Sequence, residues 1–284
     1  MNALVLMTDF GLRDRFVASM KGVALGINPA LPIIDLTHEI APFNIWEASQ
    51  TLAHTIPYWS PGTVFVAVID PGVGTKRRSV VALTNNDHLI VTPDNGTLTL
   101  VAQEQGIKNV YLIDEAIHRR PGSDSFHTFH GRDVYVYVGA LLASGKLRLD
   151  DVGKKHIKPL IQLHIPEAEI LPDAGLKGII TKIEHPYGNI VTNIPYSWID
   201  ALGASVDQKS MLQVRVWHKE TPVFAETLGI VKSFGFKSAG TPLLYQDSQG
   251  NLGLAINQGD FAKVYGMGSG TDWRIETHQV ISGS

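Results

Sequence analysis

Residues 64–72 read VFVAVIDPG, an unbroken apolar run that ends in Asp70-Pro71-Gly72. Six consecutive apolar residues, mostly β-branched or aromatic, predict a buried strand of a sheet covered by helices. The Pro and Gly that follow predict a tight turn, in which an Asp commonly accepts local backbone hydrogen bonds. In open α/β sheets ligands collect at the carboxyl ends of the strands, so Asp70 is also a candidate functional residue.

The chain on both sides of this run alternates short β-type segments with amphipathic ones. This alternation is typical of an α/β domain with a mainly parallel sheet. Two further loops follow predicted strands, Thr8-Asp9-Phe10-Gly11 and Thr92-Pro93-Asp94-Asn95-Gly96. We expect strands at 4–7, 33–36, 64–69, 80–83, 89–92 and 110–113, and helices at 16–26, 46–58, 98–104 and from about 133 to 143.

The pattern changes after a connector, residues 154–172, that is interrupted by Pro159, Pro166 and Pro172. Short strands separated by Gly, Asn and Asp turns follow it with little helical periodicity, which predicts an all-β barrel domain. We therefore expect an α/β domain over 1–160 and a β-barrel domain over 173–284. The expected strands are 179–183, 190–194, 211–217, 243–245, 252–256 and 273–275.

The composition favours a folded enzyme with a small-molecule partner. Of the 284 residues, 44% are hydrophobic and 18% are charged, which is close to globular averages. The net charge of −3 provides no basic surface for nucleic acid or an anionic membrane. The absence of cysteine excludes disulfides, thiolate nucleophiles and Cys-ligated metals. The apolar stretch at residues 3–7 is too short for a signal peptide or a membrane span, so we expect a cytoplasmic protein.

Two ionisable clusters have ordinary interpretations when each is taken alone. The loop over 71–78 lacks the order of a P-loop, and Lys76-Arg77-Arg78 can be a solvated basic turn. His127 and His130 are spaced so that they could share a helical face, but no matching carboxylate pattern accompanies them. We expect no metal site.

Five motifs, in this order, together resemble the S-adenosylmethionine hydroxide adenosyltransferases, a family related to the fluorinase and chlorinase enzymes. The resemblance covers essentially the whole chain. The motifs are Thr8-Asp9-Phe10-Gly11, Asp70-Pro71-Gly72-Val73-Gly74-Thr75-x-Arg77-Arg78, Pro93-Asp94-Asn95-Gly96, Phe129-His130-Gly131-Arg132-Asp133 and His185-Pro186-Tyr187-Gly188-Asn189-x-x-Thr192-Asn193-Ile194.

The resemblance implies hydrolysis of S-adenosyl-L-methionine (SAM) to adenosine and L-methionine, without a cofactor. It also implies a homotrimer with active sites at the subunit interfaces. The family's hydrolytic aspartate, arginine and histidine correspond to Asp70, Arg77 and His130. The substrate-binding positions implied in the same way are Asp9 for the ribose, Asn189 and Tyr187 for the adenosine portion, Glu184 and Ser248 for the methionine portion, and Ile256.

Elementary chemistry is compatible with these roles. Because a sulfonium is already a good leaving group, the enzyme has to desolvate one water and align it with the C5′–S bond. A carboxylate and a neutral histidine can accept hydrogen bonds from that water, while a guanidinium favours hydroxide character on its oxygen. The carboxylate of Asp9 can accept from both ribose hydroxyls, which we favour over its alternative interpretation as an acidic residue at a helix N-terminus.

The halogenase relatives provide a contrast. The resemblance implies that the fluorinase has tyrosine, threonine and serine at the positions of Asp70, Val73 and Gly131. A carboxylate at position 70 repels halide, so water is the expected nucleophile.

On the methionine side the chain departs from the family, with Glu184 in place of Asp, Gly253 in place of a common Glu, and Gln249 in place of the fluorinase arginine. These departures leave two alternatives to hydrolysis open: a non-catalytic SAM- or adenosine-binding protein, and, with less support, a SAM-dependent halogenase.

Overall fold

The computed structural model describes residues 2–156, 158–173, 175–205 and 210–280. The chain divides into two compact units, Met1–Leu163 and His164–Ser284. The division falls inside the proline-interrupted connector. On one side of it, the amide of Ile161 donates to the Asp94 carboxylate at 2.8 Å, and on the other the Asn193 side chain donates to the carbonyl of Pro166 at 2.8 Å. Each half of the connector is thus hydrogen-bonded to its own unit.

The first unit is built on a six-stranded sheet in the order β2-β1-β3-β5-β4-β6. Strands β1, β2, β3 and β5 pair in parallel, while β4 is antiparallel to both of its neighbours. The mainly parallel α/β class predicted from the sequence is confirmed. The strands are β1 (Leu4–Thr8), β2 (Ile33–Thr37), β3 (Val64–Val68), β4 (Ser79–Thr84), β5 (Leu89–Pro93) and β6 (Ile107–Leu112).

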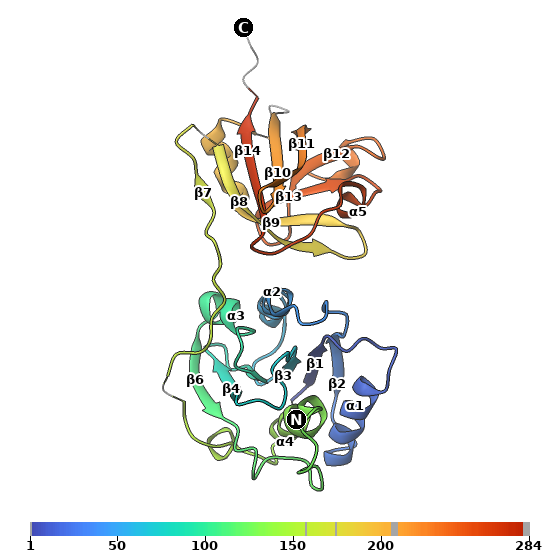
Figure 1. Ribbon diagram of the computed structural model, residues 1–284, viewed down its shortest axis with the longest axis vertical. Helices are drawn as coiled ribbons and strands as arrows, with labels where there is room; N and C mark the ends of the chain where they lie inside the picture. The colour runs from blue at the N-terminus through green and yellow to red at the C-terminus, as the bar shows by residue number, and fades with distance from the viewer. Residues whose placement is uncertain (1, 157, 174, 206–209, 281–284) are drawn as a thin grey trace. The chain divides into compact units, whose positions relative to one another are not determined.

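Helices cover both faces of this sheet (Figure 1). Helix α1 (Phe16–Ile27) packs against α4 (Val136–Ala143), and α2 (Ile45–Thr55) packs against α3 (Thr99–Glu104). The central strand β3 is buried along its whole length, as its unbroken apolar sequence predicts. Close packing requires Gly139 of α4, because a Cβ there would lie 2.4 Å from Cγ2 of Val66.

Two of the predicted helices end or begin differently from the sequence expectation. The helix expected over 46–58 ends at Thr55 and continues as one 3₁₀ turn, Ile56–Tyr58, where Pro57 has no amide hydrogen to extend the α-helical ladder. The helix expected from about 133 starts as a π-helical turn, Gly131–Tyr135, which leads into α4. Such wide turns occur frequently at functional sites.

The second unit is a strongly bent antiparallel sheet in the order β11-β10-β14-β8-β9-β13-β12 (Figure 1). The long strand β8 pairs with β14 through its first half and with β9 through its second half. The isolated bridge Ile230↔Leu244 links the two outermost strands, so the sheet nearly closes into the predicted barrel. The strands are β7 (Glu169–Ile170), β8 (Gly175–Glu184), β9 (Asn189–Pro195), β10 (Met211–His218), β11 (Thr221–Gly229), β12 (Pro242–Gln246), β13 (Asn251–Ile256) and β14 (Trp273–Gln279).

Several elements of the second unit were not predicted, including the 3₁₀ segments Tyr196–Leu202 and Phe234–Phe236. Strand β11 contains Pro222 and has no simple alternation of buried and exposed residues, yet it pairs with β10 along its length. The two-residue strand β7 and the short helix α5 (Phe261–Tyr265) are also additional. Helix α5 is capped by Asp260, whose side chain accepts from the amide of Lys263 at 2.8 Å.

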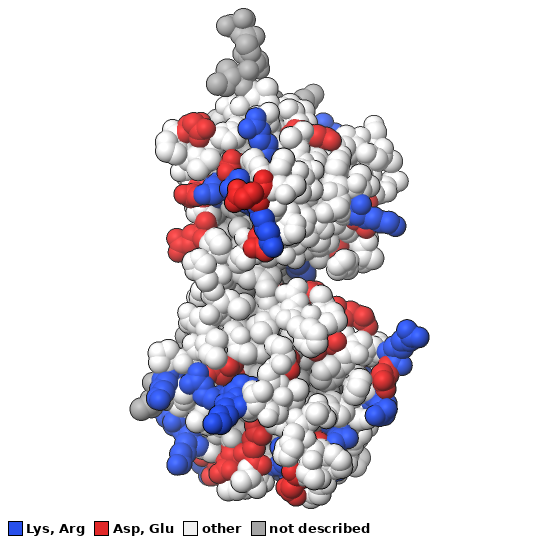
Figure 2. Space-filling model, viewed as in Figure 1, with Lys and Arg blue, Asp and Glu red and all other residues white. Residues whose placement is uncertain are grey.

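The visible surface of each unit carries intermixed acidic and basic side chains (Figure 2). This distribution agrees with the small net charge of the sequence. Within the described ranges, none of the helices combines the length and the apolarity that crossing a bilayer requires.

Candidate active site

The carboxyl ends of β1, β3 and β5 lie at one edge of the first sheet, because these strands run in parallel. Asp9, Asp70 and Asn95 follow these three strand ends. The antiparallel strand β4 starts at the same edge, where Ser79 pairs with Pro93. The residues just before β4, including Arg77, therefore lie at the same edge of the sheet as Asp70.

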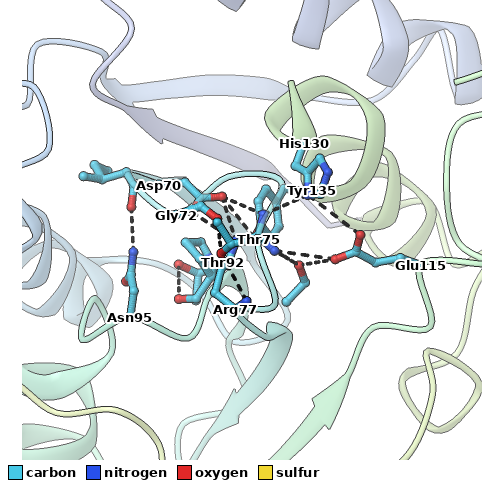
Figure 3. A network of polar contacts seen from close by, with 12 residues as sticks. Asp70, Gly72, Thr75, Arg77, Thr92, Asn95, Glu115, His130 and Tyr135 are labelled. Atoms are coloured by element: carbon cyan, nitrogen blue, oxygen red, sulfur yellow. Dashed lines mark hydrogen bonds and ion pairs between the residues drawn. The ribbon is translucent and has the colours of Figure 1, made fainter. Parts of the chain in front are cut away.

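Asp70 and Arg77 form a buried, bidentate ion pair, in which two guanidinium nitrogens donate to the carboxylate (Figure 3). Nε of Arg77 lies 3.0 Å from each carboxylate oxygen, and Nη2 lies 2.7 Å from Oδ2. The side chains of Arg77 and Asp70 are only 9% and 5% exposed. A planar guanidinium matches a carboxylate in this way with particular geometric specificity.

The turn between the two residues has the geometry that Pro and Gly predict. The amide of Val73 donates to the Asp70 carbonyl at 3.2 Å, and Thr75 Oγ1 donates to the carbonyl of Gly72 at 2.7 Å. At Gly74 φ is +75°, and a Cβ would lie 2.7 Å from the carbonyl oxygen of His127. The local bonds to Asp70 thus use its backbone carbonyl, and its carboxylate is held by Arg77.

His130 completes the cluster and receives a hydrogen bond from Arg77. Nη2 of Arg77 lies 2.8 Å from Nδ1 of His130. Because a guanidinium is only a donor, Nδ1 is the acceptor and the hydrogen of the neutral ring lies on Nε2. Nε2 is buried and has no hydrogen-bond partner among the described residues. Burial lowers the pKa of His130, Glu115 opposes this shift, and the charges of Arg77 and Arg119 add to it.

Three further residues surround Arg77 that the sequence did not single out. Ser79 Oγ accepts from Nη1 of Arg77 at 2.7 Å and donates to Oε1 of Glu115 at 2.6 Å. The Tyr135 hydroxyl lies 3.1 Å from Ser79 Oγ, and the guanidinium lies 5.3 Å from the centre of its ring. Burial raises the pKa of Tyr135 well above its ordinary value, which keeps the phenol neutral.

For two of these three residues, the sequence contains a clue to their place in the site. Ser79 lies two residues beyond Arg77 at the start of a predicted strand, and Tyr135 lies five residues beyond His130 in a predicted helix. Glu115 carried none, because it follows β6 in an irregular segment. Its Oε2 nevertheless lies 3.8 Å from Nδ1 of His130.

The neighbouring Arg and His residues lie elsewhere. Arg78 forms an ion pair with Asp94, and its Nη1 lies 3.0 Å from Nε2 of His156. His127 is exposed. The structure therefore brings Arg77 and His130 to Asp70, and not Arg78 and His127.

Asp9 lies at the same edge of the sheet in a partly buried position. Its Oδ2 accepts from the amide of Phe43 at 2.9 Å, and Phe43 has φ of +66°, an unusual conformation for a bulky residue. Burial raises the pKa of Asp9, the amide of Phe43 lowers it, and the nearby charge of Asp70 raises it further. The Asp9 carboxyl group therefore lies close enough to Asp70 for its charge to act on it.

The second unit contains a pocket of about 520 Å³. Three of the predicted substrate-binding residues, Tyr187, Asn189 and Ile256, line it. Tyr187 is 68% exposed, so most of its ring is accessible to a ligand. The remaining lining residues are Pro186, Phe234, Asn257, Gln258, Gly259 and Asp260.

Glu184 and Ser248, the two positions predicted for the methionine portion, are not among the residues that line this pocket. Oε2 of Glu184 accepts from Nδ2 of Asn189 at 3.2 Å and from the hydroxyl of Tyr245 at 3.4 Å. Ser248 is exposed in the turn between β12 and β13. Glu184 is thus connected to the pocket through Asn189, whereas Ser248 has no such connection among the described residues.

Position 131, for which the resemblance implies serine in the fluorinase, is crowded in this structure. Gly131 is buried, and a Cβ there would lie 3.1 Å from Cε2 of Phe10. A serine at this position would require the Phe10 ring to shift.

Two family models match the chain. They describe the SAM hydroxide adenosyltransferase N-terminal domain, over residues 4–153, and C-terminal domain, over residues 178–274. A Salinispora tropica protein named (R)-S-adenosyl-L-methionine hydrolase is 34% identical over 270 residues, which is 94% of this chain and 95% of the relative. A Methanocaldococcus jannaschii protein of the same name is 46% identical over 144 residues, 49% of this chain and 52% of the relative.

More distant and structural relatives extend over nearly the whole chain. A fluorinase from Actinopolyspora mzabensis is 26% identical over 298 residues, covering 96% of each chain. A crystal structure described as an uncharacterized conserved protein from Thermotoga maritima matches with a TM-score of 0.85 and 33% identity, covering 96% of this chain and 99% of that one. The likeness thus includes both units.

Proposed function

The chain belongs to the SAM hydroxide adenosyltransferase family, and from this premise we propose that it hydrolyses SAM to adenosine and L-methionine. The observation that carries the proposal is the buried cluster of Asp70, Arg77 and His130 at the carboxyl edge of the first sheet. Ligands of open α/β sheets bind at this edge. The named hydrolases among its relatives support the same reaction.

The reaction needs little from the protein beyond positioning one water. The water oxygen forms a bond to C5′ while the C5′–S bond breaks, and the electron pair of that bond returns to sulfur as the thioether of methionine. One proton leaves the water, and the Asp70 carboxylate is the group in the cluster that can accept it. Arg77 holds that carboxylate through three contacts, which fixes the direction in which its free lone pairs point.

His130 is proposed here as a hydrogen-bond donor. From the sequence we expected a neutral histidine to accept a hydrogen bond from the water, but its Nδ1 already accepts from Arg77. The nitrogen that is left, Nε2, carries a hydrogen and has no partner among the described residues. A buried donor without a partner costs free energy of folding. We therefore assign it a hydrogen bond to an oxygen of the bound water or of the substrate.

The halogenase alternative has less support. The Asp70 carboxylate oxygens can accept hydrogen bonds from a water, whereas they repel a halide at contact distance even though Arg77 balances their charge. The crowding at Gly131 also leaves no room for a serine hydroxyl to line an anion pocket unless Phe10 moves.

Substrate recognition is proposed for residues of both units. Asp9 has the acceptor chemistry for the two ribose hydroxyls, because its partly buried carboxylate has two oxygens with two lone pairs each. The pocket combines the aromatic and aliphatic walls of Tyr187 and Ile256 with the side-chain amides of Asn189, Asn257 and Gln258, which suits the adenosine portion. Glu184 and Ser248 are assigned to the methionine portion.

A homotrimer with active sites at the subunit interfaces is part of the proposal. Membership of the family supports it. Native mass spectrometry of the purified protein tests it directly: a mass of three chains is the expected result, and a monomer at working concentration would contradict it.

The decisive experiment for the reaction uses ¹⁸O-labelled water. Purified protein is incubated with SAM, and the products are followed by mass spectrometry. We expect one ¹⁸O atom in the 5′-hydroxyl of adenosine and none in methionine. Asp70→Ala should reduce turnover by at least about 100-fold while adenosine still binds, and Asp14→Ala, an exposed aspartate, serves as the control.

The same assay separates the alternatives. Binding of SAM without turnover would establish a non-catalytic binding protein. Formation of 5′-halo-5′-deoxyadenosine on addition of chloride or fluoride would establish a halogenase.

A further inference from the structure

Tyr245 and Gly253 form a directly opposed pair on the antiparallel strands β12 and β13. A Cβ at Gly253 would lie 2.6 Å from Cε1 of Tyr245 and 2.7 Å from Cζ. The tyrosine ring therefore occupies the space that any side chain at position 253 would need. A strand glycine covered by an opposite aromatic ring is a recurring way to fill such a gap.

The Tyr245 ring is also connected to the wall of the pocket in the second unit. It is buried, and its centre lies 4.8 Å from the centre of the Phe234 ring, which lines the pocket. Its hydroxyl reaches Oε2 of Glu184 at 3.4 Å. The same oxygen accepts from Nδ2 of Asn189, a second lining residue, at 3.2 Å. Glu184 is thus held by two neutral donors, one from β12 and one from β9.

These contacts leave the carboxylate with a defined free acceptor. No hydrogen bond among the described residues reaches Oε1 of Glu184, and no lysine or arginine forms an ion pair with it in those ranges. A partly buried carboxylate that has only neutral partners favours a cationic ligand. Burial and the charges of Glu184 and Asp247 raise the pKa of Tyr245, so its phenol remains protonated and acts as a donor.

We propose that Tyr245 is a positioning residue for substrate specificity, which fills the space beside Gly253 and orients the Glu184 carboxylate toward the α-ammonium group of the methionine portion. This inference rests on the proposed function, because it assigns part of the same substrate. The phenol of Tyr245 acts through its hydrogen bond to Glu184.

The test compares Tyr245→Phe with the wild-type protein. Phenylalanine keeps the ring against Gly253 and Phe234 and removes only the hydroxyl. We expect KM for SAM to rise about fivefold with kcat little changed, as for the loss of one hydrogen bond that acts on binding. Binding of 5′-methylthioadenosine, which has the nucleoside and the thioether but no amino-acid group, should not change. Tyr265→Phe is a matched control, because Tyr265 also bonds a glutamate, Glu226, but packs against Phe224 and Phe261.

A double variant tests whether Tyr245 acts through Glu184. In the Glu184→Gln background, Tyr245→Phe should add less than about twofold, since interacting residues are not additive. Equal weakening of SAM and 5′-methylthioadenosine would show a merely structural role and overturn the proposal, as would an unchanged KM. If the wild-type protein binds 5′-methylthioadenosine but neither binds nor cleaves SAM, the proposed function itself fails, and the role of Tyr245 falls with it.

Discussion

Nη2 of Arg77 lies 2.8 Å from Nδ1 of His130 and, at the same time, 2.7 Å from Oδ2 of Asp70. One guanidinium nitrogen therefore donates to both partners. Because arginine has no acceptor, this contact determines which nitrogen of the neutral imidazole carries the hydrogen. The remaining ring nitrogen of His130, Nε2, is therefore a hydrogen-bond donor, and the Asp70 carboxylate is the acceptor of the cluster.

Replacement of His130 by its two amide counterparts should separate the roles of its nitrogens. A glutamine side chain can bring an N–H close to the position of Nε2, whereas the shorter asparagine amide lies near Nδ1. We expect His130→Asn to lower kcat by about 100-fold or more and His130→Gln by about tenfold. Steady-state rates and melting temperatures of both variants provide the measurement. Equal losses, or a more active asparagine variant, would contradict the donor role.

Arg77→Lys should be far more damaging than the same change one residue later. Lysine is a single point donor and cannot hold both carboxylate oxygens, Ser79 and His130 together. We expect kcat to fall by about 100-fold or more. Arg78→Lys, whose arginine pairs with Asp94, is the control and should change kcat by less than about threefold. Similar losses in the two variants would refute the assignment of Arg77.

Glu115→Gln should shift the acid limb of the pH–rate profile to lower pH. His130 accepts from Arg77 only in its neutral form, so activity declines as pH falls through its pKa. Burial lowers that pKa, and the negative charge of Glu115 partly opposes the shift. Removal of the charge lowers the pKa further, and the neutral form then persists to lower pH. Glu226→Gln is the control, and a shift toward higher pH would be inconsistent with this network.

Asp133→Asn should destabilise the first unit. The Asp133 side chain is 0% exposed, and its carboxylate contacts Nε of Arg120 and Nε of Arg132 at 2.8 Å each. Loss of one member of a buried ion pair costs about 3–5 kcal/mol, whereas Asp87→Asn, which removes an exposed pair with Lys108, should cost less than about 1 kcal/mol. Urea unfolding at pH 7 measures both values.

The same variant has a defined pH dependence. Its arginine partners lower the pKa of Asp133 against the effect of burial. A carboxyl group with a lowered pKa stabilises the fold above its ordinary value of 3.8, and this stabilisation is lost as pH falls through the lowered value. The deficit of Asp133→Asn should therefore be full at neutral pH and shrink in acid. A deficit that grows below pH 3.8 would contradict the ion pair.

Two glycine-to-alanine changes in helices should change the free energy of unfolding in opposite directions. Gly139→Ala brings a methyl group to 2.4 Å from Val66, and we expect a loss of about 1–3 kcal/mol. Gly22→Ala in α1 meets no atom within 4 Å, and we expect a gain of about 0.5–1 kcal/mol from the reduced freedom of the unfolded chain. Thermal or urea unfolding checks both, and a stabilising Gly139→Ala would refute the close packing of α4 on β3.

The sequence by itself determined the order of most strands and helices, the fold class of each part of the chain and the position of Asp70 at a strand end. Apolar periodicity and the turn residues Pro71 and Gly72 act over a few residues, so they can be read locally. Motif resemblance, rather than local physics, selected Arg77 over Arg78 and His130 over His127. Their proximity to Asp70 is a property of the folded structure.

Only the tertiary structure decided how these groups are connected. The antiparallel direction of β4 returns Arg77 and Ser79 to the edge that holds Asp70, and the π-helical turn accompanies the packing of Tyr135 against them. Glu115 joins Ser79 across 36 positions of the chain, and Tyr245 closes over Gly253 from a neighbouring strand. Such contacts depend on strand direction and on the space left by other side chains. Neither is encoded in the few residues around each group, because both arise only when the sheet is assembled.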